Sequence, residues 1–198
     1  MQARELGIQG LWEFEPKVFG DDRGAFHEWF KAGVFKEVVG HDLTLSQANL
    51  SVSSQATVRG IHYAQVPVGQ AKYVKCVSGS VLDVIVDIRV GSPTFGHHVA
   101  VELSPANNKS LYLSEGLGHA FCALEDNSTF VYLCSTNYAP DREFEINPLD
   151  EALGIEWPFP IEELKLSPKD LAAPTLAEAM NLGNLPNLDE TKQFISTL

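Results

Sequence analysis

The middle of the chain alternates polar and apolar residues with the two-residue period of a β-strand. The stretch QANLSVS (47–53) is the clearest case, with neutral hydrogen-bonding groups at every second position. Further strand-like stretches, each bounded by Gly, Pro, Asn or Asp, follow at 58–63, 70–77, 80–90, 99–103, 111–113, 119–124 and 129–135. Many short strands at such close spacing predict a barrel or a double-sheet jelly roll.

Helical patterns are few and short. The sequence predicts helices over 32–39, over 175–182 between Pro174 and Gly183, and over 189–195. No repeat, low-complexity segment or linker divides the chain, so residues 1–198 are expected to form one domain, with a helical tail from about residue 161. We therefore predict an all-β fold with a few short peripheral helices.

Composition excludes several classes of function. With 14 Lys and Arg against 26 Asp and Glu, the chain has a net charge of −12, unlike nucleic-acid-binding proteins or proteins that bind anionic membranes. No apolar run approaches the roughly 20 residues of a membrane span, and the first ten residues lack the apolar segment of a signal peptide. Cys76, Cys122 and Cys134 are widely spaced, which favours free thiols and a cytoplasmic location.

Strand parity gives two indications of a binding cavity. Lys72 shares a strand face with the apolar Val74 and Cys76, so its side chain either extends to the strand edge or points into a cavity. The polar face of 47–53 lacks the Lys and Glu that are common on a solvent-exposed face. For this strand the sequence favours neither interpretation: its polar face either faces a ligand or is a plain solvent face.

Four residues within strand-like stretches could carry chemistry: His62, Lys72, His119 and Tyr132. Each one alone is better explained as a structural residue with a satisfied hydrogen bond. Taken together in a small barrel, they include a base, an acid and a cation. Histidine accepts a proton near pH 7, tyrosine can return one to a carbanion or enolate, and lysine stabilises an enolate oxygen. Such a set suits removal and return of a proton next to a carbonyl.

Metal-dependent and nucleophilic mechanisms have weaker support. A jelly-roll metal site often uses His-x-His, but Ala64 stands two residues after His62. His97 and His98 are adjacent and would point to opposite faces of a strand, which leaves His62 and His119 without a clear third ligand. The G-x-S-x-G, G-x-x-x-x-G-K-[ST] and G-x-G-x-x-G motifs are absent. We expect no metal and keep a metal-dependent jelly-roll enzyme as an alternative.

Several motifs occur in a family-specific order. The stretches DDRGAFHE (21–28), QANLS, RGIHY, GQAKYV, LDVIVDIRVGSPTFG, EGLGHAF and LSPKD, with Tyr132 and Tyr138, resemble the dTDP-4-dehydrorhamnose 3,5-epimerase family. The resemblance runs from about residue 7 to residue 182. It implies a cupin-type double-stranded β-helix, or jelly roll, that works without cofactor or metal, usually as a homodimer. The implied substrates are dTDP-4-keto-6-deoxyhexoses.

The resemblance also implies roles for four catalytic residues. His62 would be the base that removes the proton α to the 4-keto group, and Asp170 would pair with its imidazole. Tyr132 would be the acid on the opposite face of the sugar. Lys72 would hold the enolate oxygen.

Ten further residues match family positions that contact the nucleotide sugar: Arg23, Phe26, Glu28, Gln47, Asn49, Arg59, His119, Tyr138, Glu143 and Lys169. The two arginines would meet the diphosphate, where guanidinium donors suit phosphate oxygens. The two aromatic rings would enclose the thymine, and Glu28 would accept its ring N–H. In the expected dimer the N-terminal strands are exchanged, so Arg23, Phe26 and Glu28 would serve the neighbour's site.

Two departures from the family pattern bear on specificity. Epimerases of rhamnose synthesis usually read GFAHGF and carry Lys directly after the catalytic Tyr, whereas this chain has GLGHAF and Leu133. It looks closer to the branch that makes deoxysugars for antibiotics and other secondary metabolites. We expect an isomerase that inverts C3 and leave inversion of C5 open. A non-catalytic dTDP-sugar-binding protein is a further alternative, and Asp83 and Asp87 are interpreted as structural.

Overall fold

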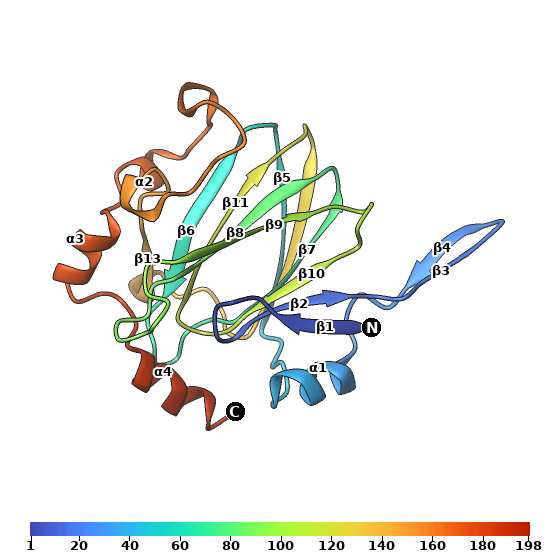
Figure 1. The fold of residues 1–198 in the computed structure, drawn as a ribbon, viewed down its shortest axis with the longest axis horizontal. Coiled ribbons are helices and arrows are strands. Elements are labelled where there is room, and N and C mark those ends of the chain that lie inside the picture. Colours follow the sequence, from blue (N-terminus) through green and yellow to red (C-terminus); the bar gives the residue numbers. More distant parts are fainter.

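The computed structural model describes all 198 residues and contains two antiparallel sheets packed face to face (Figure 1). The larger sheet has the order β1 (Gln2–Glu5), β2 (Leu11–Glu15), β10 (Ser110–Leu113), β7 (Lys72–Ser78), β12 (Ser128–Cys134), β5 (Gln47–Ser53). The smaller sheet has the order β13 (Glu143–Glu145), β6 (Val58–Ala64), β11 (Leu117–Ala123), β8 (Val81–Asp87), β9 (His98–Leu103). The architecture is a cupin-type jelly roll, so the predicted fold class is confirmed.

Short helices lie outside the sheets (Figure 1). They are α1 (Ala32–Val39), α2 (Pro168–Leu171), α3 (Leu176–Asn181) and α4 (Leu188–Ile195), with 3-10 turns η1 (Pro140–Arg142), η2 (Glu151–Leu153) and η3 (Ile161–Glu163). From residue 161 onward all of the elements are helical. No helix is both long and apolar enough to cross a membrane.

Apolar residues form three layers around the sheets. Between the sheets, Val74 and Phe130 pack with Ile85 in the main core. The outer face of the smaller sheet is covered by the C-terminal segment, including the buried Leu176 of α3. On the outer face of the larger sheet, α1 contributes Phe35 to the third layer. One apolar layer therefore fills the space between the sheets, and a further layer covers the outer face of each sheet.

One predicted strand is shorter in the structure. The stretch 80–90 was expected to be extended throughout, but β8 ends at Asp87. Beyond it, the Arg89 guanidinium turns back and donates to both carboxylate oxygens of Asp87 at 2.8 Å, with both side chains buried. Ser92 and Thr94 donate to the same carboxylate at 2.6 Å. The buried ion pair therefore fixes the turn that ends the strand, in agreement with the structural interpretation of Asp87.

The N-terminal strands were not predicted from the sequence. β1 and β2 extend the larger sheet, while β3 (Val18–Asp21) and β4 (Gly24–His27) form a separate hairpin that projects from the body (Figure 1). At its tip the Asp21 carboxylate accepts the backbone N–H of Arg23 at 2.9 Å, and Gly24 has φ +128°. The hairpin thus presents the residues of the DDRGAFHE motif away from the rest of the chain.

Candidate active site

A cavity of about 370 Å³ lies between the two sheets and is called the site cavity here. Its walls come from β5, β7 and β12 of the larger sheet, from β6, β11 and β13 of the smaller sheet, and from α2. Sixteen residues line it: Gln47, Asn49, Ser51, Arg59, His62, Gln70, Lys72, His119, Phe121, Tyr132, Tyr138, Glu143, Glu145, Ser167, Lys169 and Asp170. Most of these side chains are polar, so the site cavity suits a ligand rich in hydrogen-bonding groups.

A histidine–carboxylate pair joins the smaller sheet to α2. His62 Nε2 lies 2.8 Å from Asp170 Oδ1, with 45% of the His62 side chain exposed and only 5% of that of Asp170. Ser167 caps α2 and donates its hydroxyl to Asp170 Oδ2 at 2.8 Å. Burial alone would raise the pKa of Asp170, but the hydrogen bonds of His62 and Ser167 lower it below its ordinary value. Asp170 is thus held as a carboxylate that orients the accessible imidazole.

A β-bulge brings His62 and Arg59 to the same wall. Residues three apart on a regular strand face opposite sides, yet both line the site cavity. Opposite β11 the register shifts, because His119 pairs with His62 and Phe121 pairs with Arg59. Gly60 adopts φ +108° here, and a Cβ atom on it would lie 2.3 Å from the His119 carbonyl oxygen. The extra residue in β6 therefore needs glycine and changes the parity of the strand.

Lys72 lies at the start of β7 and points into the site cavity, which decides between the two orientations left open by the sequence. It is 8% exposed, and its ammonium takes part in none of the ion pairs of the chain. Burial lowers its pKa, against the opposing effects of Cys134, Glu143 and Asp83. A buried and unpaired ammonium is available to a developing negative charge on a ligand.

Tyr132 belongs to the larger sheet, whereas His62 belongs to the smaller one. In the register of β12 and β5, Tyr132 stands opposite Asn49. Burial is the largest cause that raises the pKa of Tyr132, reinforced by Cys134 and opposed by Arg59 and by a hydrogen bond with Asn49. The phenol therefore stays protonated at neutral pH and can act as a proton donor.

A second histidine–carboxylate pair lies deeper. His119 Nε2 is 2.6 Å from Asp83 Oδ1, and both side chains are buried. The His119 ring stacks on Phe130 with the ring centres 6.0 Å apart. The other Asp83 oxygen has no partner. Asp83 thus lies behind the cavity wall and orients His119, consistent with its interpretation as a structural residue.

Polar groups also connect the remaining walls. The Gln47 amide donates to Asn49 Oδ1 at 2.8 Å and accepts the backbone N–H of Tyr138 at 2.8 Å. Lys169 of α2 forms an ion pair with Glu145 of β13, and this contact is the largest cause that raises the pKa of Lys169. These contacts fix the side chains around the site cavity before a ligand binds.

Five lining residues were not among the predicted site residues: Ser51, Gln70, Phe121, Glu145 and Ser167. Ser51 could have been found, because it belongs to the polar face of the 47–53 pattern, and its buried hydroxyl has no partner in the structure. Ser167 precedes Pro168, a typical start of a helix. No sequence signal distinguishes Glu145 or Phe121.

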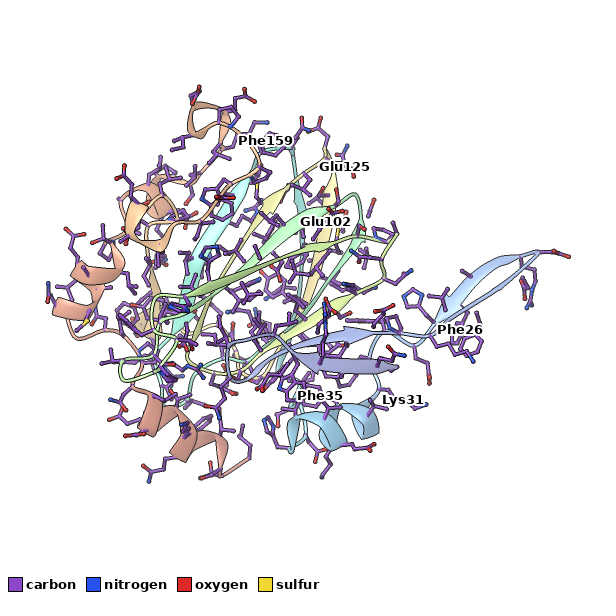
Figure 2. The ribbon with its side chains drawn as sticks, viewed as in Figure 1. Phe26, Lys31, Phe35, Glu102, Glu125 and Phe159 are labelled. Atoms are coloured by element: carbon purple, nitrogen blue, oxygen red, sulfur yellow. The ribbon has the colours of Figure 1, made fainter.

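Eleven of the fourteen predicted site residues line the site cavity, and three lie elsewhere. Arg23, Phe26 and Glu28 belong to the β3–β4 hairpin or directly follow it. Phe26 is 66% exposed and lies on the projecting arm (Figure 2). Arg23 pairs with Asp21, and Glu28 pairs with Lys31 at 3.2 Å. These three residues do not reach the site cavity of their own chain.

The chain contains no group of three or more His, Cys, Asp or Glu residues arranged to hold a metal ion. The ring of His98 instead faces the Leu153 carbonyl oxygen, 3.0 Å from Nδ1. What the cavity does bring together is an imidazole oriented by a carboxylate, a protonated phenol on the other sheet and an unpaired ammonium. This combination can move a proton off and onto a carbon next to a carbonyl.

Known proteins are similar to this chain in sequence and in fold. At 54% identity, the chain matches dTDP-4-dehydrorhamnose 3,5-epimerase of Mycolicibacterium smegmatis, over all of this chain and 97% of that protein. A dTDP-4-dehydro-6-deoxyglucose 3-epimerase of a Streptomyces species is 52% identical, over 91% of this chain and 92% of the relative.

Solved structures of epimerases also superpose closely on this chain. The rmlC epimerase of Mycobacterium tuberculosis superposes with a TM-score of 0.96 at 47% identity, over all of this chain and 99% of that one. ChmJ, a 3'-monoepimerase from Streptomyces bikiniensis in complex with dTDP-quinovose, gives 0.92 at 49% identity, over 96% and 95% of the two chains. The family model for dTDP-4-dehydrorhamnose 3,5-epimerase matches residues 5–178. The chain therefore belongs to the dTDP-4-dehydrorhamnose 3,5-epimerase family.

Proposed function

We propose that this protein is an isomerase that epimerises a dTDP-4-keto-6-deoxyhexose at C3 by proton transfer through an enolate. The observation that carries the proposal is the arrangement of the site cavity, with His62 on the smaller sheet paired to Asp170 of α2, and Lys72 and Tyr132 on the larger sheet. Membership of the epimerase family supports it, because relatives named as 3-epimerases and as 3,5-epimerases both act at C3. The proposed setting is deoxysugar biosynthesis, including that of antibiotics.

The proposed reaction begins at His62. Because Asp170 accepts the Nε2–H, the lone pair of Nδ1 is left to remove the proton from C3. The electrons of the C3–H bond form the C3–C4 double bond, and the 4-keto oxygen becomes an enolate. The ammonium of Lys72 stabilises this negative charge.

The second half of the reaction returns a proton from the other face. Tyr132 donates its phenolic proton to C3 as the enolate returns to a ketone, which leaves a phenolate that solvent reprotonates. Asp170 stabilises the imidazolium formed on His62 until it loses its proton to water. Since the base and the acid belong to different sheets, removal and return occur on opposite faces of the sugar, and the configuration is inverted.

The nucleotide end of the substrate is proposed to lie against the remaining polar residues. Arg59 would bind the diphosphate, Gln47, Asn49 and His119 would donate and accept hydrogen bonds, and Tyr138 would stack on thymine. Glu143 and Lys169 are the proposed further substrate contacts. All seven side chains line the site cavity.

We further propose a homodimer in which the hairpin of one chain completes the site of its partner. The hairpin carries Arg23 and Phe26, leaves Phe19 and Phe26 more than half exposed, and does not reach its own site cavity. Each chain is proposed to act as one domain in the cytoplasm, in keeping with three buried free cysteines.

Proton NMR in D2O with dTDP-4-keto-6-deoxyglucose tests the reaction. The wild type should incorporate deuterium at C3 and invert it, and the same spectra report whether C5 exchanges. His62→Asn should abolish exchange, whereas the exposed His97→Asn should not. Tyr132→Phe should retain exchange and change the product. Retained exchange in His62→Asn would remove His62 from the role of base, and an unchanged product with Tyr132→Phe would do the same for the proposed acid.

Two other outcomes would favour the alternatives. Binding of dTDP with no deuterium incorporation would make the chain a non-catalytic dTDP-sugar-binding protein. Stoichiometric iron or zinc that is lost together with His62 or His119 would indicate a metal-dependent enzyme.

Mixing two inactive variants tests the dimer. In a mixed dimer of Phe26→Ala and His62→Asn chains, one site receives an intact His62 and an intact partner hairpin. Random exchange of subunits should therefore restore about 25% of the wild-type activity. No recovery above the parent variants, or a sedimentation mass of one chain, would contradict the shared site.

A further inference from the structure

A smaller cavity of about 160 Å³ is lined in part by Ala71, the residue that precedes Lys72 at the start of β7. The buried carboxyl group of Glu115 lines it, with only 2% of the residue exposed. Glu115 belongs to the EGLGHAF motif, yet it does not line the site cavity and the proposed mechanism does not use it. Burying a carboxyl group costs free energy, so the question is what the hydrogen bonds of Glu115 hold in place.

Hydrogen bonds connect Glu115 to the residue before Lys72. The Ser135 hydroxyl donates to Glu115 Oε1 at 3.3 Å and accepts the backbone N–H of Ala71 at 2.8 Å. The backbone N–H of Ser135 donates to the Ala71 carbonyl at 3.0 Å. Burial raises the pKa of Glu115, while backbone N–H groups, the charge of His41 and the Ser135 hydroxyl act against this effect. The chain therefore enters β7 through a buried network that ends at Glu115.

The turn that leads into β7 also packs directly against Glu115. A Cβ atom on Gly69, which has φ +71°, would lie 2.7 Å from Glu115 Cγ. The Thr136 hydroxyl donates to the Gly69 carbonyl at 2.9 Å, and Gln70 donates to the Thr136 carbonyl at 3.0 Å. Residues 69–71 are thus held on one side by Glu115 and on the other by the end of β12.

Lys72, in contrast, has no ion pair that fixes its ammonium. A lysine side chain has four rotatable bonds, so its position depends on where the backbone starts and on the walls around it. The charges that influence Lys72 are those of Cys134, Glu143 and Asp83, and Glu115 is not among them. The hydrogen-bonded route from Glu115 to Lys72 passes through Ser135 and the backbone of Ala71.

We propose that Glu115 is a positioning residue that places the Lys72 ammonium in the site cavity through the Glu115–Ser135–Ala71 hydrogen bonds. The inference rests on the proposed function, in which Lys72 holds the enolate oxygen. Only one oxygen of Glu115 is used, since Oε2 has no partner, and neither has the nearby hydroxyl of Tyr112. Glu115 acts as a hydrogen-bond acceptor, so glutamine should replace it.

The test compares four variants of the full-length protein in the C3 deuterium-exchange assay. Glu115→Ala and Ser135→Ala should lower kcat by on the order of 10- to 100-fold, because the enolate oxygen loses a correctly placed ammonium. Their Kd for dTDP should match that of the wild type, since the nucleotide residues are untouched. Glu115→Gln should stay within about 3-fold of the wild type. Tyr112→Phe, the matched control in the same small cavity, should leave kcat unchanged.

Several results would overturn the inference. One is wild-type kcat in a folded Glu115→Ala protein, and if that variant does not fold, wild-type kcat in Ser135→Ala has the same force. A loss in Glu115→Gln equal to that in Glu115→Ala would show that charge is required. In a Lys72→Met background, Glu115→Ala should cause no further loss, whereas an undiminished loss would assign Glu115 a general structural role. A wild type without any exchange would refute the proposed function itself.

Discussion

Replacing Asp170 with asparagine tests how much the catalytic imidazole depends on its partner. The substitution keeps the size of the side chain and an oxygen that can accept the Nε2–H of His62, now 2.8 Å from Oδ1. It removes the negative charge of a side chain that is only 5% exposed. The other carboxylate oxygen accepts a hydrogen bond from the Ser167 hydroxyl. The change therefore isolates the effect of charge from the effect of shape.

The expected size follows from the type of hydrogen bond. A hydrogen bond to a charged group contributes about 1.5–3 kcal/mol, against about 1 kcal/mol for a neutral one. The imidazolium that forms on His62 should lose the difference, about 0.5–2 kcal/mol. At about 1.4 kcal/mol for each factor of ten, kcat should fall by roughly 2- to 30-fold. An asparagine that turned its amide N–H toward His62 would impose the wrong tautomer and cause a larger loss.

The assay is the rate of deuterium incorporation at C3 under saturating substrate, with KM and the Kd for dTDP measured on the same preparation. Ser167→Ala is the matched control, because it removes the second hydrogen bond to Asp170 and leaves the charge in place. It should cost less than Asp170→Asn. A folded Asp170→Asn protein with wild-type kcat, or a loss confined to KM, would refute the reasoning.

Three further predictions concern stability. Gly60→Ala should lower the melting temperature and abolish exchange, because its Cβ would meet the His119 carbonyl oxygen, whereas Gly33→Ala, with open space around it, should do neither. Arg89→Met should cost about 3–5 kcal/mol in urea unfolding, because it leaves the fully buried Asp87 unpaired, and an unchanged unfolding midpoint would contradict this. The folded-state pKa of Asp170 is lowered, so its carboxylate stabilises the fold above the ordinary value of 3.8 and loses this effect as the pH falls further. Urea unfolding between pH 6 and pH 3 should therefore show a shallower decline for Asp170→Asn than for the wild type.

Much of the sheet structure could be predicted because burial on one face imposes a two-residue period. The pattern of 47–53 predicts β5 with its observed bounds. The parity of Lys72 with Val74 and Cys76 likewise predicts that it shares their strand face, and only the structure decides that its side chain points into the site cavity rather than to the strand edge. Both predictions rest on regular strands, in which each side chain's direction follows from its position in the sequence.

The parts that could not be predicted depend on irregular or distant contacts. Arg59 and His62 share a wall only because of the bulge at Gly60, which no periodicity reveals. Glu145 lines the site cavity and forms an ion pair with Lys169, which is more than twenty residues away along the chain. The N-terminal hairpin escaped prediction because its apolar residues are exposed in the single chain, so no alternation marks a buried face.

Because the proposed base and acid lie on different sheets, the stereochemistry of the reaction can depend on the distance between the sheets. The separation of His62 from Tyr132 is set by the thickness of the hydrophobic layer between the sheets, in which the rings of Phe121 and Phe130 pack at a tilt of 38° with their centres 4.6 Å apart. A smaller or larger side chain in that layer would move proton donor and acceptor relative to each other without altering either one. Laboratory evolution of new sugar configurations should therefore find productive substitutions among these interior aromatic residues as well as among those that touch the sugar.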